Sequence, residues 1–173
     1  PHSYLWLCTT APAQIYYEMR RAWDYGARKI WALNVGDIKP AEYDIEFFMD
    51  MAWNIDAIRP DNIYRHLHDF MSRTFTPQSA QELTDIMNEY YYLANIRRPE
   101  FMGWSREEEY SKIKGGKTPV TDTEFSPEEI EQRITAYQNL EKRVKSIKKQ
   151  IPKELHDSFF QLVEYPVSGA ANM

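Results

Sequence analysis

The sequence contains one cysteine, Cys8, and no apolar run long enough to cross a bilayer. A single cysteine excludes an intrachain disulfide, and its apolar neighbours favour a small buried side chain. Every apolar stretch is far shorter than the roughly 18 residues that a membrane span requires. No basic segment leads into an apolar one, as it does in a signal peptide. We therefore expect a globular chain with no membrane partner.

An excess of positive charge is also missing. The 21 basic and 26 acidic residues give a net charge of -5, and no basic stripe alternates with aromatic side chains. Binding to a phosphate backbone relies on such a stripe, so nucleic acid is disfavoured as a partner. The 5 Trp, 12 Tyr and 8 Phe are compatible with stacking on sugars, but core packing is the commoner use of aromatic residues.

The length of 173 residues, 43% of them hydrophobic, is enough for one ordinary core or two small ones. The chain begins at Pro1 rather than Met, and its last residues, Gly169–Met173, resemble the start of a helix. We therefore expect an excerpt from a longer protein.

The first 55 residues predict the order strand, helix, strand, helix. Two short apolar runs, Tyr4–Cys8 and Lys29–Leu33, are the expected strands. The helix between them has Pro12 in its first turn and Gly26 where a left-handed C-terminal cap belongs. The second helix is expected over Glu42–Trp53. Its apolar face follows helical spacing: Ile45, Phe48, Met49 and Ala52.

After Asn54 the pattern is helical only. One helix is expected from Pro60 to about Ser72, and another opens at Thr76–Pro77 and must end before Pro99. Residues 104–108 favour a short helix, and residues 114–125 favour a loop. The predicted fold is therefore mainly α, with a helical bundle after the strand-helix-strand-helix segment.

The last third contains the clearest helix start. Ser126–Glu129 combines a hydroxyl cap, a proline at the first position and a glutamate placed to return a hydrogen bond. A final helix is expected from Glu154 to about Val163, with Pro166 interrupting it. The long helix carries one apolar seam for a neighbouring helix: Ile130, Tyr137, Leu140, Val144, Ile147 and Ile151.

The candidate site follows the second predicted strand, where the apolar run gives way to Asn34, Gly36, Asp37 and Lys39. Polar groups at a strand's C-terminal end are rigidly held and open to a ligand, as in α/β enzymes. Gly36 allows a backbone bend that other residues resist.

Four carboxylates occur close to this point, and paired carboxylates are what acid-base cleavage of a glycosidic bond requires. The spacing does not assign them, because acidic residues also favour the first turn of a helix through its dipole. That alternative leaves only Asp37 in need of another role. The four are Asp37, Glu42, Asp44 and Glu46.

Other polar motifs carry weaker signals. His66 and His68 are two residues apart, so on a helix they face different sides, and we expect no metal site. Arg97–Glu100 matches either a carboxylate clamp or, more commonly, basic residues at a helix end. Gly115–Lys117 lacks the rest of a phosphate loop.

The segment Asn34–Glu42, followed by Ile45–Trp53, resembles the family 115 glycoside hydrolases. Arg97–Glu100 and Tyr165–Val167 also resemble the family pattern, though each would be weak alone. The resemblance runs over most of the chain. It implies a xylan α-1,2-glucuronidase, which removes glucuronic acid or its 4-O-methyl ether from xylan with inversion and needs no cofactor.

The family architecture implies that residues 1–55 are the end of a (β/α)₈ catalytic barrel. Residues 56–173 would then be the helical-bundle domain, truncated at its C-terminus. By the same resemblance Asn34, Asp37 and Lys39 are substrate-binding residues. The barrel needs eight strands and the chain offers two, so the general acid and its partner base would lie outside it. We expect the isolated chain to be inactive.

Two further expectations concern surroundings. The unpaired strand Lys29–Leu33 would pair with a second copy, giving a homo-oligomer. Enzymes that act on plant polysaccharide are usually exported, so kinship suggests a periplasmic or extracellular location. The alternative function is a non-catalytic helical interaction module, with the seam of the long helix docking on a partner.

Overall fold

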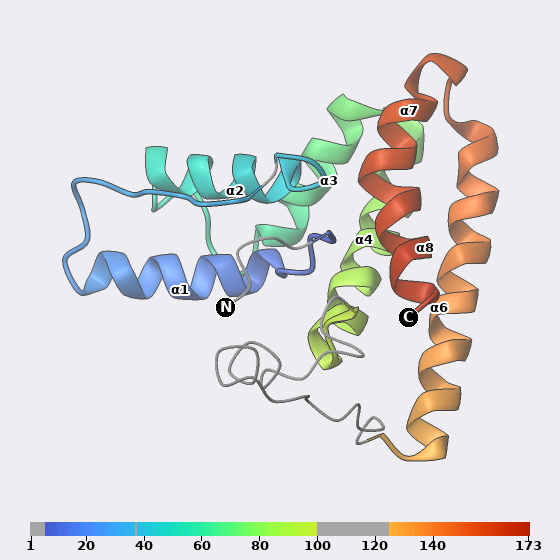
Figure 1. The fold of residues 1–173 in the computed structure, drawn as a ribbon. Coiled ribbons are helices and arrows are strands. Elements are labelled where there is room, and N and C mark those ends of the chain that lie inside the picture. Colours follow the sequence, from blue (N-terminus) through green and yellow to red (C-terminus); the bar gives the residue numbers. More distant parts are fainter. Residues whose placement is uncertain (1–5, 37, 100–124) are drawn as a thin grey trace.

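In the described part of the chain, two of the longer helices, those that begin after Thr76 and Ser126, start at short capping motifs. The structure is a computed structural model that describes residues 6–36, 38–99 and 125–173, and this part of the chain is all-α (Figure 1). The mainly α prediction is thus confirmed for these ranges. The longer helices are α1 (Pro12–Asp24), α2 (Glu42–Trp53), α3 (Ile63–Thr74), α4 (Pro77–Ile96) and α6 (Pro127–Ile147), and the C-terminal ones are α7 (His156–Phe159) and α8 (Tyr165–Ala171).

The predicted hydroxyl caps begin two of these helices. At α4, the Thr76 hydroxyl accepts a hydrogen bond from the Ser79 amide over 3.2 Å. At α6, Ser126 and Glu129 form the reciprocal capping box, over 3.2 and 2.8 Å. Each cap satisfies amides that a helix start leaves without a partner, and a proline follows both.

The end of α1 is also as predicted. Gly26 has a φ of 99°, in the left-handed region. Its amide bonds to the Trp23 carbonyl and the Ala27 amide bonds to the Ala22 carbonyl, each over 2.9 Å. This is a Schellman cap, which closes the last carbonyls of the helix and turns the chain toward α2. At the start of α1, the cap residue is Ala11, whose side chain makes no hydrogen bond.

The strand predictions for the first 55 residues are wrong where the structure describes them. Residues 29–33, and residues 6–8 of the first expected strand, form no strand. A strand is stable only when a neighbour takes its hydrogen bonds, and among the described residues no such neighbour exists. Instead Trp31 packs between Trp23 and Phe48, with ring centroids 6.4 and 5.7 Å apart, while Ile30 is 86% exposed.

The buried face of α2 differs from the predicted one. Met49 is 52% exposed and Ala52 is also exposed, whereas Tyr43 and Phe47 are buried. The cause is α3, since Tyr43 packs on Phe70 with centroids 5.0 Å apart. Because α3 packs here, the buried face of α2 is shifted by about one residue from the face that the apolar periodicity predicts.

The helix expected from Pro60 begins at Ile63 instead. The Asn62 side chain accepts a hydrogen bond from the Arg59 amide over 2.8 Å and donates one to the Ala57 carbonyl over 2.9 Å. These bonds close a turn around Pro60, so the helix can start only after it. The helix and loop expected within residues 104–125 lie outside the described residues, apart from Phe125.

The C-terminal helix is longer than predicted, because Pro166 does not stop it. A π-helical turn, Phe160–Glu164, joins α7 to α8, and Pro166 lies in the first turn of α8, where a missing amide costs little. The resulting rod runs beside α6 (Figure 1). Val163, Val167 and Ala170 are buried along it.

The core lies where α4 meets α3, α6 and the C-terminal rod. The seam predicted on α6 is buried there, apart from Ile130, which is 39% exposed. Its partners are helices of the same chain, so this seam is not free to dock on another protein. The helices α1 and α2 form a separate layer beside this bundle (Figure 1). No helix in the described ranges is both long and apolar enough to span a membrane.

Candidate functional site

A pocket of about 220 Å³ opens between four segments of the N-terminal part. Its walls are residues 7–10, Ile15 of α1, residues 33–35, and residues 40–41 with the first turns of α2. The volume is far above the roughly 10–15 Å³ that one water molecule needs, so a small ligand can enter. Most of the lining is apolar, and the polar side chains are those of Thr9, Thr10, Asn34 and Asp44, with the thiol of Cys8.

Asn34, one of the predicted binding residues, lies in the pocket wall. Its Oδ1 accepts a hydrogen bond from the Gly36 amide over 3.3 Å, and Gly36 has the positive φ, 71°, that its predicted bend needs. This turn fixes the carbonyl side of the Asn34 amide, so the Nδ2 group is the side that can donate to a ligand.

Of the other two predicted binding residues, the structure describes only Lys39. Asp37 lies outside the described residues. Lys39 does not line the pocket, and its ammonium group donates to Gln161 over 2.7 Å and lies 3.9 Å from the Glu42 carboxylate. Gln161 also donates to Glu42, so Lys39 ties the start of α2 to the C-terminal rod.

Asp44 is the polar residue that the sequence reading undervalued. Its side chain is buried in the first turn of α2, with 8% of the residue exposed. The thiol of Cys8 donates to Oδ2 over 2.9 Å, and the hydroxyl of Tyr91 donates to Oδ1 over 3.4 Å. Burial raises the pKa of Asp44 to about 7, although both hydrogen bonds act to lower it.

A signal for this burial exists in the sequence. Asp44 precedes Phe48 by four residues and Met51 by seven, so all three share one helix face. An acidic residue on an apolar stripe is costly unless its oxygens are hydrogen-bonded. The interpretation of Asp44 through the helix dipole does not take account of that stripe, because the predicted buried face contains Met49 instead of Met51.

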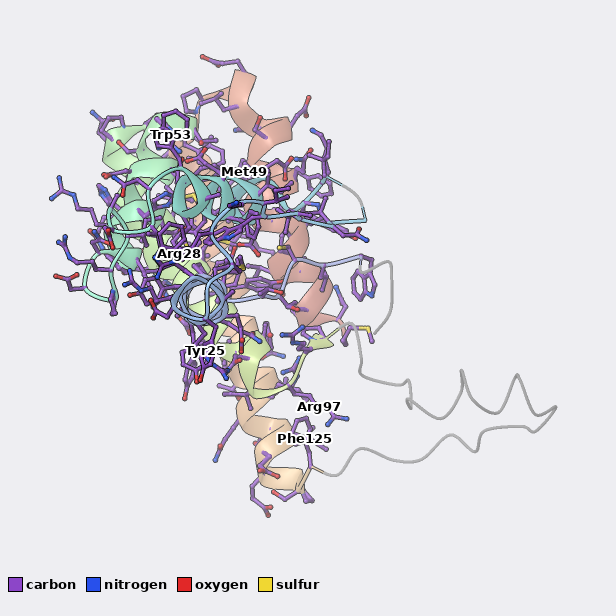
Figure 2. All side chains as sticks on the ribbon, turned by 90° about the vertical axis from the view of Figure 1, so that its left-hand side faces the viewer. Tyr25, Arg28, Met49, Trp53, Arg97 and Phe125 are labelled. Carbon is purple, nitrogen blue, oxygen red and sulfur yellow. The ribbon has the colours of Figure 1, made fainter. Side chains whose placement is uncertain are left out.

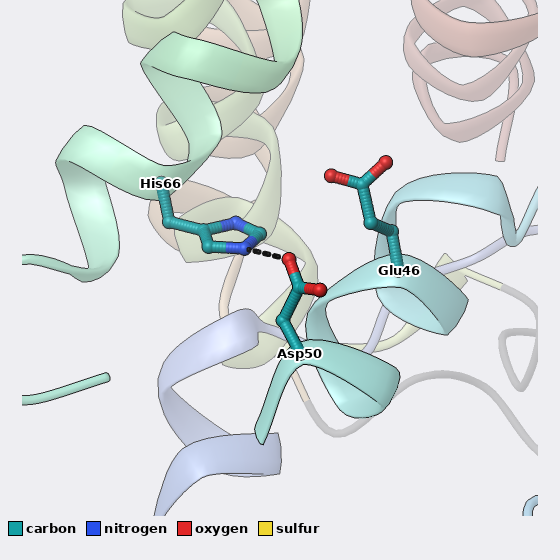
Figure 3. A group of neighbouring side chains, drawn as sticks. All are labelled: Glu46, Asp50 and His66. Carbon is teal, nitrogen blue, oxygen red and sulfur yellow. Dashed lines mark hydrogen bonds and ion pairs between the residues drawn. The ribbon is translucent and has the colours of Figure 1, made fainter. Parts of the chain in front are cut away.

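A second cluster joins α2 to α3 (Figure 3). The Asp50 carboxylate lies 3.0 Å from Nε2 of His66, and Glu46 extends toward the same space, one possible ligand atom from each residue lying within 4.8 Å of the others. The guanidinium of Arg73 contacts Glu46 and already supplies its positive charge. We interpret the cluster as one hydrogen bond, between His66 and Asp50, and one ion pair, between Arg73 and Glu46, which together fasten α2 to α3.

The remaining motifs have structural partners. His68 contacts Asp69 at 3.5 Å, whereas His66 bonds to the Asp50 carboxylate. The two histidines thus have different partners, as their spacing of two residues on a helix predicts. The Arg97 guanidinium lies over the Phe125 ring, 5.8 Å from its centroid (Figure 2). Arg98 donates to Gln14 over 3.1 Å. Gly115–Lys117 lies outside the described residues.

Comparisons with known proteins agree with the resemblance to the family 115 glycoside hydrolases. The sequence profile described as "Glycosyl hydrolase family 115" matches residues 1–101. A solved structure is titled "A novel family GH115 4-O-Methyl-alpha-glucuronidase, BtGH115A, with specificity for decorated arabinogalactans". That protein is 43% identical to this chain, and the two structures superpose with a TM-score of 0.88. The match covers 99% of this chain and 22% of the chain of the solved structure. None of the curated proteins matches. The chain thus spans about a fifth of the length of that relative, and it belongs to glycosyl hydrolase family 115.

Proposed function

We propose that this chain is part of an enzyme that removes glucuronic acid, or its 4-O-methyl ether, from xylan side chains with inversion. The observation that carries the proposal is the 43% identity over 99% of the chain to a protein titled a 4-O-methyl-α-glucuronidase. The same title names decorated arabinogalactans, so these are the second candidate substrate. Both polymers carry acidic sugars, and the same class of hydrolysis would release them.

Within that enzyme, residues 1–55 would complete the (β/α)₈ barrel and residues 56–173 would form the helical domain. Exposed apolar side chains support this division. Ile30 is 86% exposed, Ile38 66% and Trp53 92%, and Figure 2 shows Trp53 and Met49 at the surface of the α1–α2 layer. Exposed apolar side chains mark an interaction surface where they form a contiguous patch. The rest of the barrel would cover these exposed side chains.

Inverting hydrolysis needs an acid and a base about 6.5–9.5 Å apart on opposite faces of the sugar. The loop after residue 33 cannot supply both groups, so the catalytic pair would come from other barrel strands. In this chain Asn34 would donate from Nδ2 to the bound uronic acid, and Asp37 would act beside it. Lys39 would act indirectly, because its contacts with Glu42 and Gln161 hold the start of α2 in place.

The activity test uses the complete coding sequence that contains this chain. Release of 4-O-methylglucuronic acid from glucuronoxylan, with the anomer identified by NMR at early times, is the expected result. If the enzyme released the acidic sugar from arabinogalactan but not from glucuronoxylan, the proposed substrate would be arabinogalactan instead of xylan. Release of neither sugar would overturn the proposal. The 173-residue chain by itself should release no sugar, since its catalytic pair is missing.

The role of Asn34 is tested in the complete protein by Asn34→Ala. We expect kcat/KM to fall about 10- to 100-fold, the effect of losing one or two hydrogen bonds to the ligand. Asn139→Ala, at an exposed position on α6, is the matched control and should leave kcat/KM unchanged. Equal activity of both variants would remove Asn34 from the binding site.

A homo-oligomer is part of the same proposal, because the exposed residues around Ile30 would be covered by a second copy when the chain is alone. Light scattering of the isolated chain should give at least twice the mass of 20.6 kDa. A monodisperse monomer would contradict this expectation.

A further inference from the structure

The carboxyl group of Asp44 joins two walls of the pocket. It extends from α2, which forms one wall, and it accepts the thiol hydrogen bond of Cys8 from the other wall, over 2.9 Å. The Tyr91 hydroxyl, from α4, holds its second oxygen over 3.4 Å. Three segments that are distant in the sequence therefore meet at one buried carboxyl group.

The wall that contains Cys8 has a second attachment to the same helix. The Tyr90 hydroxyl donates to the Cys8 carbonyl over 3.1 Å. Tyr90 and Tyr91 thus fasten both the Cys8 segment and Asp44 to α4. Thr9 and Thr10, which follow Cys8 directly, line the pocket opposite the start of α2. Their position relative to α2 depends on these bonds.

We propose that Asp44 is a positioning residue of this pocket, whose carboxyl group sets the placement of residues 8–10 against α2 and changes that placement when it gains or loses a proton. The inference rests on the proposed function in one respect, that the pocket belongs to the sugar-binding site. Asp44 acts through Cys8 and Tyr91 and is not required to touch the substrate.

The chemistry of the carboxyl group gives the reason. An ionised Asp44 accepts from both donors, one at each oxygen. A protonated Asp44 gains a donor at one oxygen and is a weaker acceptor there, so its bond to Cys8 or to Tyr91 weakens or reverses. The pocket wall attached to that partner then moves or loosens.

The titration falls near neutral pH because of the surroundings. Burial raises the pKa of Asp44, and the titratable groups that face it are Cys8, Tyr91 and Tyr43. In the described part of the chain no cation is among the groups that shift this pKa. The hydrogen bonds from Cys8 and Tyr91 favour the charged form of Asp44.

The first experiment is NMR of the 173-residue chain with ¹³C-labelled aspartate and ¹⁵N-labelled backbone. We expect the Asp44 carboxyl carbon to titrate near pH 7 and the amide signals of Thr9 and Asn34 to move with the same midpoint. In Asp44→Asn this midpoint should vanish from both amides, whereas Asp69→Asn, on α3 outside the pocket, should retain it. Amides that keep the midpoint in Asp44→Asn would overturn the proposal.

A milder variant tests the mechanism in a chain that keeps the carboxyl group. Tyr91→Phe removes one bond that favours the charged form, so the Asp44 midpoint should rise by about half to one pH unit. Cys8→Ser keeps a donor and should leave the midpoint nearer that of the wild type than Cys8→Ala does. An unchanged midpoint in Tyr91→Phe and in Cys8→Ala would show that these contacts do not control Asp44.

The second experiment uses the complete enzyme. The pH profile of kcat/KM should contain an ionisation near 7 that is absent in Asp44→Asn and shifted upward in Tyr91→Phe. A profile that is identical in all three proteins would overturn the proposal. If the complete protein hydrolyses neither polymer, the proposed function fails, and the NMR titration of Thr9 and Asn34 still decides the role of Asp44.

Discussion

The ring of Phe159 meets the ring of Phe75 edge to face, with their centroids 6.0 Å apart. Phe75 directly follows α3, and Phe159 ends α7, so this pair fastens the C-terminal rod to the α3–α4 corner. Phe159 is fully buried, at 0% exposure, while its neighbour Phe160 is 53% exposed. Two adjacent phenylalanines therefore differ in burial and offer a matched comparison.

Phe159→Ala should lower the free energy of unfolding by about 3–5 kcal/mol, because it leaves a cavity in a packed core. Urea denaturation followed by circular dichroism measures the change. Phe160→Ala should cost less than about 1 kcal/mol. Similar losses in both variants would mean that the rod is not packed as described.

Tyr90→Phe should lower the free energy of unfolding by about 1–2 kcal/mol. It keeps the buried ring but removes the donor to the Cys8 carbonyl, which is left without that bond in a largely buried region. Tyr92→Phe, at a position that is 66% exposed, is the control and should be close to neutral in the same urea titration. A loss confined to Tyr92→Phe would contradict the contact.

The stability of the wild type should contain a component that falls as pH rises from about 4 to about 7. The pKa of Asp44 is about 7 in the folded chain against an ordinary 3.8. Between these values the folded state holds the proton and the unfolded state has lost it, so raising the pH favours unfolding. At about 1.4 kcal/mol per pH unit, the component is on the order of 4 kcal/mol.

Asp44→Asn removes this component, and other carboxyl groups affect the wild type and the variant alike. The stability difference between the two proteins should therefore change steadily from pH 4 to pH 7 and stay constant above it. Asp69→Asn should show no such trend. A constant difference over the whole range would place the folded pKa of Asp44 near its ordinary value.

Gly26→Ala should destabilise the chain by about 1 kcal/mol. A methyl group at this position meets no atom within 4 Å, so the cost comes only from the positive φ of 99° that a side chain disfavours. Thermal unfolding, with Gly26→Asn as the milder comparison, measures it. An equal cost for alanine and asparagine would point to packing rather than backbone conformation.

Local motifs explain the parts of the fold that were predictable. The caps at Thr76, Ser126 and Gly26 act within a few residues of themselves, so reading neighbours is sufficient to find them. The range Glu42–Trp53 was predictable for the same reason. The face that this helix buries was not predictable, because contacts with α3 and α4 determine it.

The missing strand at Lys29–Leu33 has a different cause. Its apolar pattern is suited to a strand, but a strand also depends on partners that a single sequence segment does not contain. The prediction that Pro166 interrupts the last helix is wrong because a proline rule considers only the missing amide. The π-helical turn before Pro166 places this residue in the first turn of α8, where the helix tolerates it.

The sequence by itself determined where α4 and α6 begin and where α1 ends, that one cysteine allows no internal disulfide, and that the chain resembles family 115. Only the tertiary structure decided that Cys8, Asp44 and Tyr91 share one buried contact and that Asn34 reaches the same pocket while Lys39 does not. The physical reason is range. Caps and helical periodicity act over three or four residues, whereas the burial that raises the pKa of Asp44 comes from segments up to 83 residues apart.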